Sequence, residues 1–273
     1  MLMAPSISRS LFIGLGGIGV KTILDVKAMY EGELGCVPDI TAFIGIDLSS
    51  TRMADVSLDL VKENEFSRYV SLYLSDPKEY YNEHRSQFNW MPDDSVNLLD
   101  SLTRCETEQY RTNGRFAFIA NIDKIEKTIR EAVYSISSVT EDRKGRWRLD
   151  DGRLHVYLVF SACGGIGSGA FADMSFLLRY MYPHNIEINA YCISSGIFPD
   201  CGKRGLANTY STLLDADYLM STISQFTLHN SPFTISLFSQ FTIHYFHNSQ
   251  FHYFCPQTWK FISPFNIVLA LSQ

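Results

Sequence analysis

The sequence predicts an α/β fold, a mostly parallel sheet with helices on both faces. Three observations lead to this prediction. Apolar runs with the length and flanks of buried strands alternate with segments of helical spacing. Two of the strand-to-helix turns are built from glycine. Hydrophobic residues make up 46% of the 273 residues, which is enough for a large core.

The first strand–helix–strand unit occupies the N-terminal part of the chain. Residues 9–14 form a short apolar run that ends in glycines, which is typical of a buried strand. Residues 40–46 form a second such run, which ends at Asp47. The helix between them has a predicted buried face formed by Val20, Ile23, Leu24 and Ala28. This order predicts two parallel strands joined by a right-handed crossover.

The middle of the chain gives weaker signals. Residues 51–114 are polar and rich in Tyr, Ser and Asp, and they predict one or two helices with long connections. A clearer helix is expected from Asn121 onward, because apolar residues return there at helical spacing. Its predicted buried positions are Ile125, Ile129, Ala132, Val133 and Ile136. Residues 141–147 follow as a charged surface connection.

A second strand–helix–strand unit follows this connection. Residues 154–160 predict a strand that runs into a glycine-rich turn, and residues 186–194 predict the next strand. The helix between them is expected to end near Pro183. Its apolar positions are Phe171, Met174, Leu177, Leu178 and Met181. The last predicted helix spans residues 205–220, with apolar positions Leu206, Tyr210, Leu213, Leu214 and Leu219.

The composition changes sharply at the end of this helix. We therefore divide the chain into an α/β domain, residues 1–220, and an irregular tail, residues 221–273. The tail holds one charged residue, Lys260, and no Asp, Glu or Gly, whereas a soluble domain needs surface charges and turn glycines. Two interpretations stay open: a β region packed at the edge of the domain, or an aberrant or truncated segment, which is slightly favoured.

The tail also contains side chains of the zinc-ligand type. They are His244, His247, His252 and Cys255. The tail is rich in histidine throughout, however, and no carboxylate or second cysteine supports a site. We therefore predict no metal site there.

Charge and cysteine content exclude several classes of protein. The net charge of −6, without a basic stripe, argues against binding to a nucleic-acid backbone. The six cysteines are scattered and include no CxxC pair, which indicates reduced thiols rather than a disulfide framework. The apolar run at residues 11–13 is too short for a signal peptide or a membrane span. We therefore expect a cytoplasmic protein.

The first glycine turn is a candidate phosphate-binding loop. Its candidate binding residues are Gly14, Gly16, Gly17, Ile18 and Gly19. The turn fits GxGxxG, but that dinucleotide pattern expects an acid about 20 residues further on, whereas Asp47 lies 28 residues beyond Gly19. A Walker A loop is excluded, because Val20 separates Gly19 from Lys21. The first turn alone thus fits several nucleotide folds.

The second glycine turn is the more specific one, and it lies about 150 residues after the first. Four glycines in seven residues let the backbone approach an anion and turn its N–H groups inward. The following helix, expected to begin near Ser168, adds unpaired N–H donors and a positive dipole end. Ser168 is expected to cap that helix or to bond a phosphate oxygen. The candidate binding residues are Cys163, Gly164, Gly165, Ile166, Gly167, Ser168 and Gly169.

Together the two turns resemble those of the tubulin and FtsZ superfamily. Residues 163–169 resemble the tubulin signature GGGTGSG, and residues 12–19 resemble the first phosphate loop of FtsZ. The resemblance extends in order over residues 8–220 and is strongest to divergent bacterial tubulin-like proteins. It implies a Rossmann-like GTPase domain that binds GTP or GDP with accompanying Mg²⁺ and associates with itself into filaments. It also implies that the family's C-terminal domain is missing from this chain.

The same resemblance assigns roles to further residues. Asp47 lies where the second strand ends near the nucleotide. Gly114 and Arg115 match the loop that senses the γ-phosphate, and Asp200 matches the ribose-side loop. Asn208 matches the asparagine that the family places against the guanine.

Three departures from the family pattern affect the expected activity. Ile166 replaces the signature threonine and Cys163 replaces its first glycine, which weakens the phosphate cradle but leaves its backbone N–H groups. In the family, acids of the next subunit position the attacking water, and this chain has no Asp or Glu after Asp217. We therefore expect nucleotide binding with little hydrolysis unless a partner subunit completes the site, and we assign no catalytic residue.

Two alternative functions stay open at this point. The first is a Rossmann-type oxidoreductase that uses NAD(P) or a flavin, in which Asp47 would contact a ribose 2′-hydroxyl. The second is a non-catalytic α/β interaction module, in which both glycine loops are only tight turns.

Overall fold

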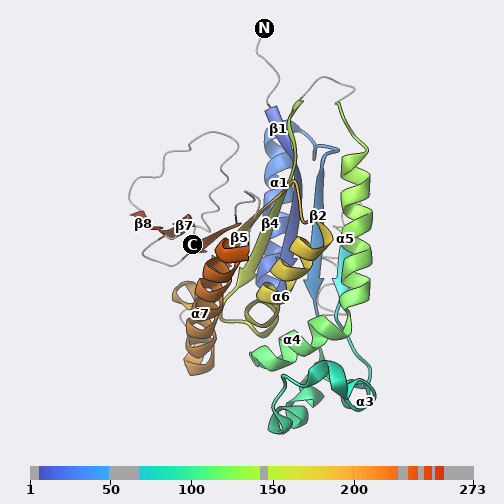
Figure 1. Ribbon diagram of the computed structural model, residues 1–273, viewed down its shortest axis with the longest axis vertical. Coiled ribbons are helices and arrows are strands. Elements are labelled where there is room, and N and C mark those ends of the chain that lie inside the picture. Colours follow the sequence, from blue (N-terminus) through green and yellow to red (C-terminus); the bar gives the residue numbers. More distant parts are fainter. Residues whose placement is uncertain are drawn as a thin grey trace.

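The computed structural model describes residues 6–48, 68–141, 147–198, 200–226, 233–238, 243–247 and 250–254. Within these ranges, one eight-stranded sheet forms the centre of the molecule, and helices cover both of its faces (Figure 1). The predicted fold class, a mostly parallel sheet with helices on both faces, is confirmed.

The sheet is parallel over most of its width. Across it the strands follow the order β3–β2–β1–β4–β5–β6–β7–β8. All neighbours from β3 to β6 pair in parallel, and β7 and β8 pair antiparallel beyond them. The strand bounds are β1 (Ser6–Leu15), β2 (Thr41–Asp47), β3 (Arg68–Ser71), β4 (Arg148–Ser161), β5 (Ile186–Ile193), β6 (Phe233–Phe238), β7 (Ile243–His247) and β8 (Gln250–Phe254).

The direction of winding changes once, between β1 and β4. From β1 the chain proceeds to β2 and β3 on one side, and then crosses back to β4 and β5 on the other side of β1. Ligands of open α/β sheets bind outside the carboxyl ends of the strands at such a switch point. The ends of β1 and β4 are therefore the first place to look for a site.

The helices fall into α-helices and short 3₁₀ segments. The α-helices are α1 (Gly16–Leu34), α3 (Pro77–Glu83), α4 (Arg111–Ala120), α5 (Ile122–Ser137), α6 (Gly165–Met181) and α7 (Gly202–Phe226). The 3₁₀ segments are η1 (Arg85–Phe88), η2 (Asp93–Arg104) and η3 (Ser195–Ile197). Within the described ranges, none of these helices has both the length and the apolarity that crossing a bilayer requires.

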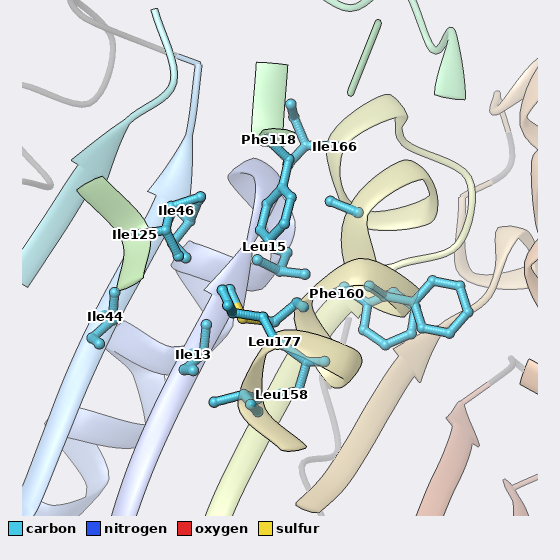
Figure 2. Close-up of a cluster of buried hydrophobic side chains, with 14 of the residues drawn as sticks. Ile13, Leu15, Ile44, Ile46, Phe118, Ile125, Leu158, Phe160, Ile166 and Leu177 are labelled. Atoms are coloured by element: carbon cyan, nitrogen blue, oxygen red, sulfur yellow. The ribbon is translucent and has the colours of Figure 1, made fainter. Parts of the chain in front are cut away.

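Successive side chains of a strand point to opposite faces of the sheet, so the core is divided between the two faces. Ile13 and Leu15 of β1 point to one face, where they pack with side chains of α4, α5 and α6 (Figure 2). Phe12 points to the opposite face and packs with Val20 of α1. Because both faces are covered, the central strands carry continuous apolar runs, which is why they were predictable as buried parallel strands.

Two helix faces differ in how well periodicity predicted them. All five predicted positions of α5 are buried. In α1, however, Ala28 is exposed and Leu24 is only partly buried, so the predicted face is wrong there. The buried face of α1 contains Val26 in their place, beside the correctly predicted Val20 and Ile23.

The middle of the chain holds more structure than the sequence predicted. Strand β3 was missed, because its four residues carry no apolar run. Residues 111–115 were predicted as a loop before a helix, but they form the first turns of α4. Part of the predicted segment, residues 51–67, lies outside the described residues.

Helix α7 differs from its prediction in both length and orientation. It begins at Gly202 and continues to Phe226, across the predicted boundary at residue 220. Leu206, Tyr210 and Leu214 were predicted on a buried face, but they are exposed.

The described parts of the tail are the end of α7, residues 221–226, and three strands. Strands β6, β7 and β8 all lie within residues 221–273 and continue the sheet beyond β5. The side chains of the four potential zinc ligands lie outside the described residues, so the expectation of no metal site there stays a prediction.

Candidate functional site

The two glycine turns meet at the carboxyl ends of neighbouring strands. Strands β1 and β4 pair in parallel, with Leu15 opposite Phe160. Strand β1 runs directly into α1 at Gly16, and three residues connect the end of β4 to the start of α6 at Gly165. Parallel pairing therefore places both turns at the same edge of the sheet, although they are about 150 residues apart in sequence.

A cavity of about 510 Å³ lies between these turns. This volume is within the range of small-molecule and cofactor sites. From the predicted site, the lining contains Gly16, Gly17, Ile18, Asp47, Cys163, Gly164, Gly165, Ile166, Gly167 and Asp200. It also contains residues that the sequence did not identify, namely Leu15, Thr107, Gln109, Ser161, Phe198 and Cys201.

Both helices that start at the cavity lack the side chains that ordinarily neutralise a helix N-terminus. The cap positions are Leu15 in α1 and Gly164 in α6, and neither makes a side-chain capping hydrogen bond. Neither helix has an acidic residue in its first turn. The first backbone N–H groups of a helix have no partner within the helix, and its N-terminus carries a partial positive charge. The cavity is therefore suited to an anion held by backbone groups.

A positive φ explains the glycine at position 16. Its φ of +72° lies in the left-handed region, which favours glycine. A Cβ atom there would lie 3.4 Å from the Cβ of Ile166 and 3.5 Å from the backbone N of Gly167. The two turns thus face each other within van der Waals contact of a side chain at position 16.

Other predicted glycines serve packing rather than the cavity. A Cβ on Gly14 would lie 2.5 Å from the backbone carbon of Gly19, and one on Gly19 would collide with the carbonyl oxygen of Val159. These two glycines allow α1 to lie against the sheet. Gly169 performs the same role for α6, because a Cβ there would collide with the carbonyl oxygen of Arg111.

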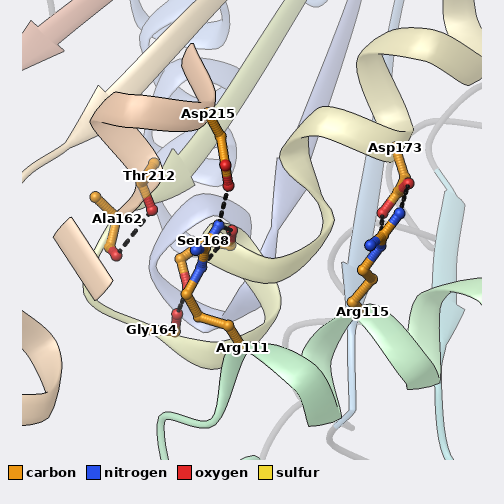
Figure 3. A network of polar contacts seen from close by, with 8 residues as sticks. All are labelled: Arg111, Arg115, Ala162, Gly164, Ser168, Asp173, Thr212 and Asp215. Carbon is orange, nitrogen blue, oxygen red and sulfur yellow. Dashed lines mark hydrogen bonds and ion pairs between the residues drawn. The ribbon is translucent and has the colours of Figure 1, made fainter. Parts of the chain in front are cut away.

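Ser168 lies inside helix α6 and not at its cap. The helix begins three residues earlier than predicted, with Gly164 as its cap. Ser168 is fully buried, and its hydroxyl donates to the carbonyl oxygen of Gly164 one turn back (Figure 3). It therefore fixes the conformation of the second turn instead of lining the cavity.

Arg111 connects the second turn to α7. Its guanidinium donates to the carbonyl oxygen of Ser168, from Nε at 3.1 Å and from Nη2 at 2.8 Å. The same Nη2 atom forms an ion pair with Asp215 of α7 (Figure 3). The Arg111 side chain of α4 thus links α6 to α7.

Gly114 and Arg115 lie on α4 away from the cavity lining. A Cβ on Gly114 would collide with the carbonyl oxygen of Gly165, so this glycine lets α4 press against the start of α6. Arg115 forms a two-pronged ion pair with Asp173, at 2.7 and 2.9 Å, and its guanidinium stacks 4.4 Å from the centre of the Trp90 ring. The cavity instead receives Thr107 and Gln109, which lie just upstream of the segment that the resemblance indicated.

The cavity also receives two carboxylates, Asp47 from the end of β2 and Asp200 from the loop after β5. Burial raises the pKa of Asp47 from 3.8 to about 6, and a hydrogen bond from the backbone of Leu48 lowers it in part. Asp47 is thus a carboxyl group that titrates near neutral pH inside the cavity.

Asn208 connects two parts of the lining from behind. It is 7% exposed, and its side-chain N–H groups donate to the carbonyl oxygens of Gln109, at 2.7 Å, and Cys163, at 3.1 Å. Arg204, one turn earlier in α7, donates to the carbonyl oxygen of Glu108 at 2.7 Å. Glu108 and Gln109 have φ angles of 51° and 61°, so α7 stabilises a backbone conformation that non-glycine residues seldom adopt.

Comparison with known proteins agrees with this geometry. The family model described as "Tubulin like" matches residues 11–243. CetZ from Methanosaeta thermophila strain DSM 6194 aligns with a TM-score of 0.50 and 14% identity, over 85% of this chain and 46% of that one. TubZ of Clostridium botulinum phage c-st aligns with a TM-score of 0.48 and 15% identity, over 85% of this chain and 52% of that one. A search of curated proteins found no match.

The chain thus spans about half the length of these solved structures. The family match, in contrast, covers most of the chain and includes both glycine turns. Taken with the parallel sheet and with the cavity between the two turns, it shows that this chain belongs to the tubulin-like family.

Proposed function

We propose that this chain binds GTP or GDP in the cavity between the two glycine turns. The observation that carries the proposal is the pair of helix N-termini at one cavity, both without capping side chains or acids. Phosphates are the anions that such paired N-termini accept best, because several backbone N–H groups converge on them. The family to which the chain belongs supports a guanine nucleotide as the ligand.

We assign the phosphates to the two turns, at Gly16–Ile18 and Gly164–Gly167. Asp47 and Asp200 are the carboxylates of the lining, and Mg²⁺ typically uses one or two carboxylates together with phosphate oxygens. They are the residues that would hold Mg²⁺ beside a bound nucleotide. Asp200 is also the candidate for the ribose side.

The roles of three predicted residues change in this proposal. Thr107 and Gln109 replace Gly114 and Arg115 as the candidates nearest the terminal phosphate, since they line the cavity. Asn208 orders the lining through its two backbone partners, which is compatible with a position beside the base.

We further propose that the chain alone hydrolyses GTP slowly and that hydrolysis needs a partner subunit that itself carries a carboxylate able to position the attacking water. The sequence holds no carboxylate after Asp217 that could position an attacking water from the next subunit. Membership of the tubulin-like family supports self-association, and the scattered cysteines of the sequence, which include no CxxC pair, support a cytoplasmic location.

A dinucleotide is the second candidate ligand, and one observation favours it. Asp47 ends the strand next to β1, as the ribose-binding acid of a dinucleotide fold does. Competition against a fluorescent GTP analogue by GTP, GDP, ATP and NADH separates the two candidates. Displacement by GTP and GDP supports our proposal, whereas displacement by NADH alone refutes it.

The variant Gly164→Asp tests the position of the phosphates. No atom lies within 4 Å of a Cβ at this position, so an aspartate side chain fits without a clash. It would cap α6 and place a negative charge against the phosphates. Two like charges 5 Å apart at an effective dielectric constant of 20 repel by about 3 kcal/mol, so nucleotide affinity should fall on the order of 100-fold.

Gly32→Asp is the matched control. It adds the same charge at an exposed position of α1 that also has free space for a side chain. Its nucleotide affinity should equal that of the parent chain. Equal affinity of the Gly164→Asp variant, in a chain that unfolds at or above the parent's temperature, would rule out our placement of the phosphates.

A further inference from the structure

Two cysteines that lie close to each other line the same cavity. Cys163 belongs to the second glycine turn, and Cys201 immediately precedes α7. Neither is in a disulfide. A Cβ on Gly205 would lie 3.2 Å from the Cβ of Cys163 and 3.1 Å from that of Cys201. The two Cβ atoms are therefore no farther apart than the sum of these distances, about 6 Å, whereas a disulfide needs about 3.5–4.5 Å.

The space between the two thiols is open because residue 205 is glycine. A side chain there would lie 3.3 Å from the sulfur of Cys201 and against both Cβ atoms. Cys201 is also followed by Gly202, whose φ of +66° marks a bend where the chain enters α7. Rotation at this bend is the movement that would bring the two sulfurs together.

The two thiols differ in their access to solvent. Cys163 is 7% exposed, and its sulfur lies 3.0 Å from the hydroxyl oxygen of Ser161. Burial raises the pKa of the Cys163 thiol, the hydrogen bond with Ser161 lowers it, and the nearby Cys201 raises it again. Cys201 is only partly buried. An oxidant that enters the cavity therefore meets Cys201 first, with Cys163 behind it.

Cys192 is a third thiol in this region, but it is less suited to react. It lies in β5, where it is 1% exposed and held by pairing to β4 and β6. It does not line the cavity.

We propose that Cys163 and Cys201 form a reversible disulfide across the cavity when a hydroperoxide is present, and that this bond and a bound nucleotide exclude each other. The exclusion rests on the proposed function, whereas the disulfide does not. The bond would tie the second glycine turn to the start of α7 in the space assigned to the nucleotide.

The chemistry requires one peroxide for each disulfide. The thiolate sulfur of Cys201 attacks a peroxide oxygen, the O–O bond breaks, and the departing hydroxide takes a proton to become water. The resulting sulfenic acid is attacked by the sulfur of Cys163, the S–O bond breaks, and a second water leaves. The two sulfurs lose two electrons in total, and the peroxide gains them. A dithiol reductant reverses the bond by exchange.

Peptide mapping of the full chain tests the disulfide. The reduced chain is treated with hydrogen peroxide, blocked with iodoacetamide and digested with trypsin and the endoproteinase Asp-N. Cleavage before Asp200 separates Cys192 from Cys201. We expect one cross-linked peptide pair that joins Cys163 to Cys201 within a single chain and disappears with dithiothreitol.

Variants assign the bond and provide the control. Cys201→Ser should abolish the cross-linked pair, whereas Cys36→Ser, which removes a cysteine outside the cavity lining, should leave it unchanged. A bond from Cys163 to Cys192, a bond between two chains, or full alkylation of both cavity thiols after peroxide would each overturn the proposal.

A second measurement tests the exclusion by nucleotide. With saturating GDP, the rate of cross-linking should fall at least fivefold, and the oxidised chain should bind a fluorescent GDP analogue at least tenfold more weakly until it is reduced. If the oxidised chain binds GDP as well as the reduced chain, the exclusion is wrong. If the reduced chain binds no guanine nucleotide, the proposed function is wrong, and the peptide map still shows whether the disulfide forms.

Discussion

Replacing Asp47 by asparagine should stabilise the folded chain at alkaline pH and leave its stability unchanged at acid pH. Burial raises the pKa of this carboxyl from 3.8 to about 6. The folded state therefore holds the proton more tightly than the unfolded state does. Its ionisation destabilises the fold fully above pH 6 and not at all below about pH 4.

The magnitude follows from this difference in pKa. Each pKa unit corresponds to about 1.4 kcal/mol, so the ionised carboxylate costs the folded state up to about 3 kcal/mol. Because Asp47 lines a cavity that water can enter, we expect a gain of about 1–3 kcal/mol from Asp47→Asn at pH 8. Asparagine keeps the size of the side chain and an oxygen that accepts the hydrogen bond from Leu48.

Urea unfolding at pH 8 and pH 4, followed by tryptophan fluorescence, measures the effect. The variant should unfold at higher urea concentration than the parent at pH 8 and at the same concentration at pH 4. Asp39→Asn, which removes an exposed carboxylate, is the control and should shift neither midpoint. Equal gains of the Asp47 variant at both pH values would refute an electrostatic cause, and no gain at pH 8 would refute the burial of the charge.

Three further substitutions test the assignment of residues to packing or to the cavity. Gly19→Ala places a Cβ against the carbonyl oxygen of Val159 and should lower the free energy of unfolding in urea by about 3 kcal/mol. Gly32→Ala is the control, because position 32 lies in open space on the same helix, and it should raise the free energy of unfolding by about 0.5–1 kcal/mol. Arg115→Gln removes the ion pair with Asp173 and should lower the free energy of unfolding by about 1 kcal/mol without changing GTP affinity. A loss of affinity by tenfold or more would show that Arg115 contacts the bound phosphates.

The elements that could be predicted from the sequence are those whose signals are local. Strands β1, β2 and β4 contain apolar runs, β5 alternates buried apolar residues with partly buried ones, and α5 has a regular apolar spacing that is fully buried. The two glycine turns were found for the same reason, since glycine clusters directly after apolar runs are visible without any knowledge of tertiary contacts.

The parts that could not be predicted depend on contacts between distant segments. The glycine-rich start of α6 was expected to be loop, because glycine is a poor helix former. In the structure, Gly114 and Arg111 of α4 pack against it and make the helical conformation favourable. Thr107 and Gln109 reach the cavity through backbone conformations that α7 imposes from nearly 100 residues away.

Helix α7 shows a different limit of periodicity. Its apolar spacing identified a helix correctly, but the spacing does not reveal which stripe is covered. Leu206 and Tyr210 are exposed, whereas Ala216 and Leu219 are buried against the rest of the fold. The apolar spacing was therefore consistent with either side of α7 facing the rest of the fold.

The pairing of β1 with β4 has a consequence for the order in which the chain becomes able to bind. The first glycine turn is complete by residue 19, yet its counterpart does not exist until residue 169 has been synthesised. Contacts of such long sequence separation form slowly, because the loop between them must be closed first. A nucleotide that needs both turns cannot stabilise the first turn before the second turn has formed. Once the nucleotide binds, it stabilises the pairing of β1 with β4 by mass action. The free energy of unfolding of the finished domain therefore increases with nucleotide concentration.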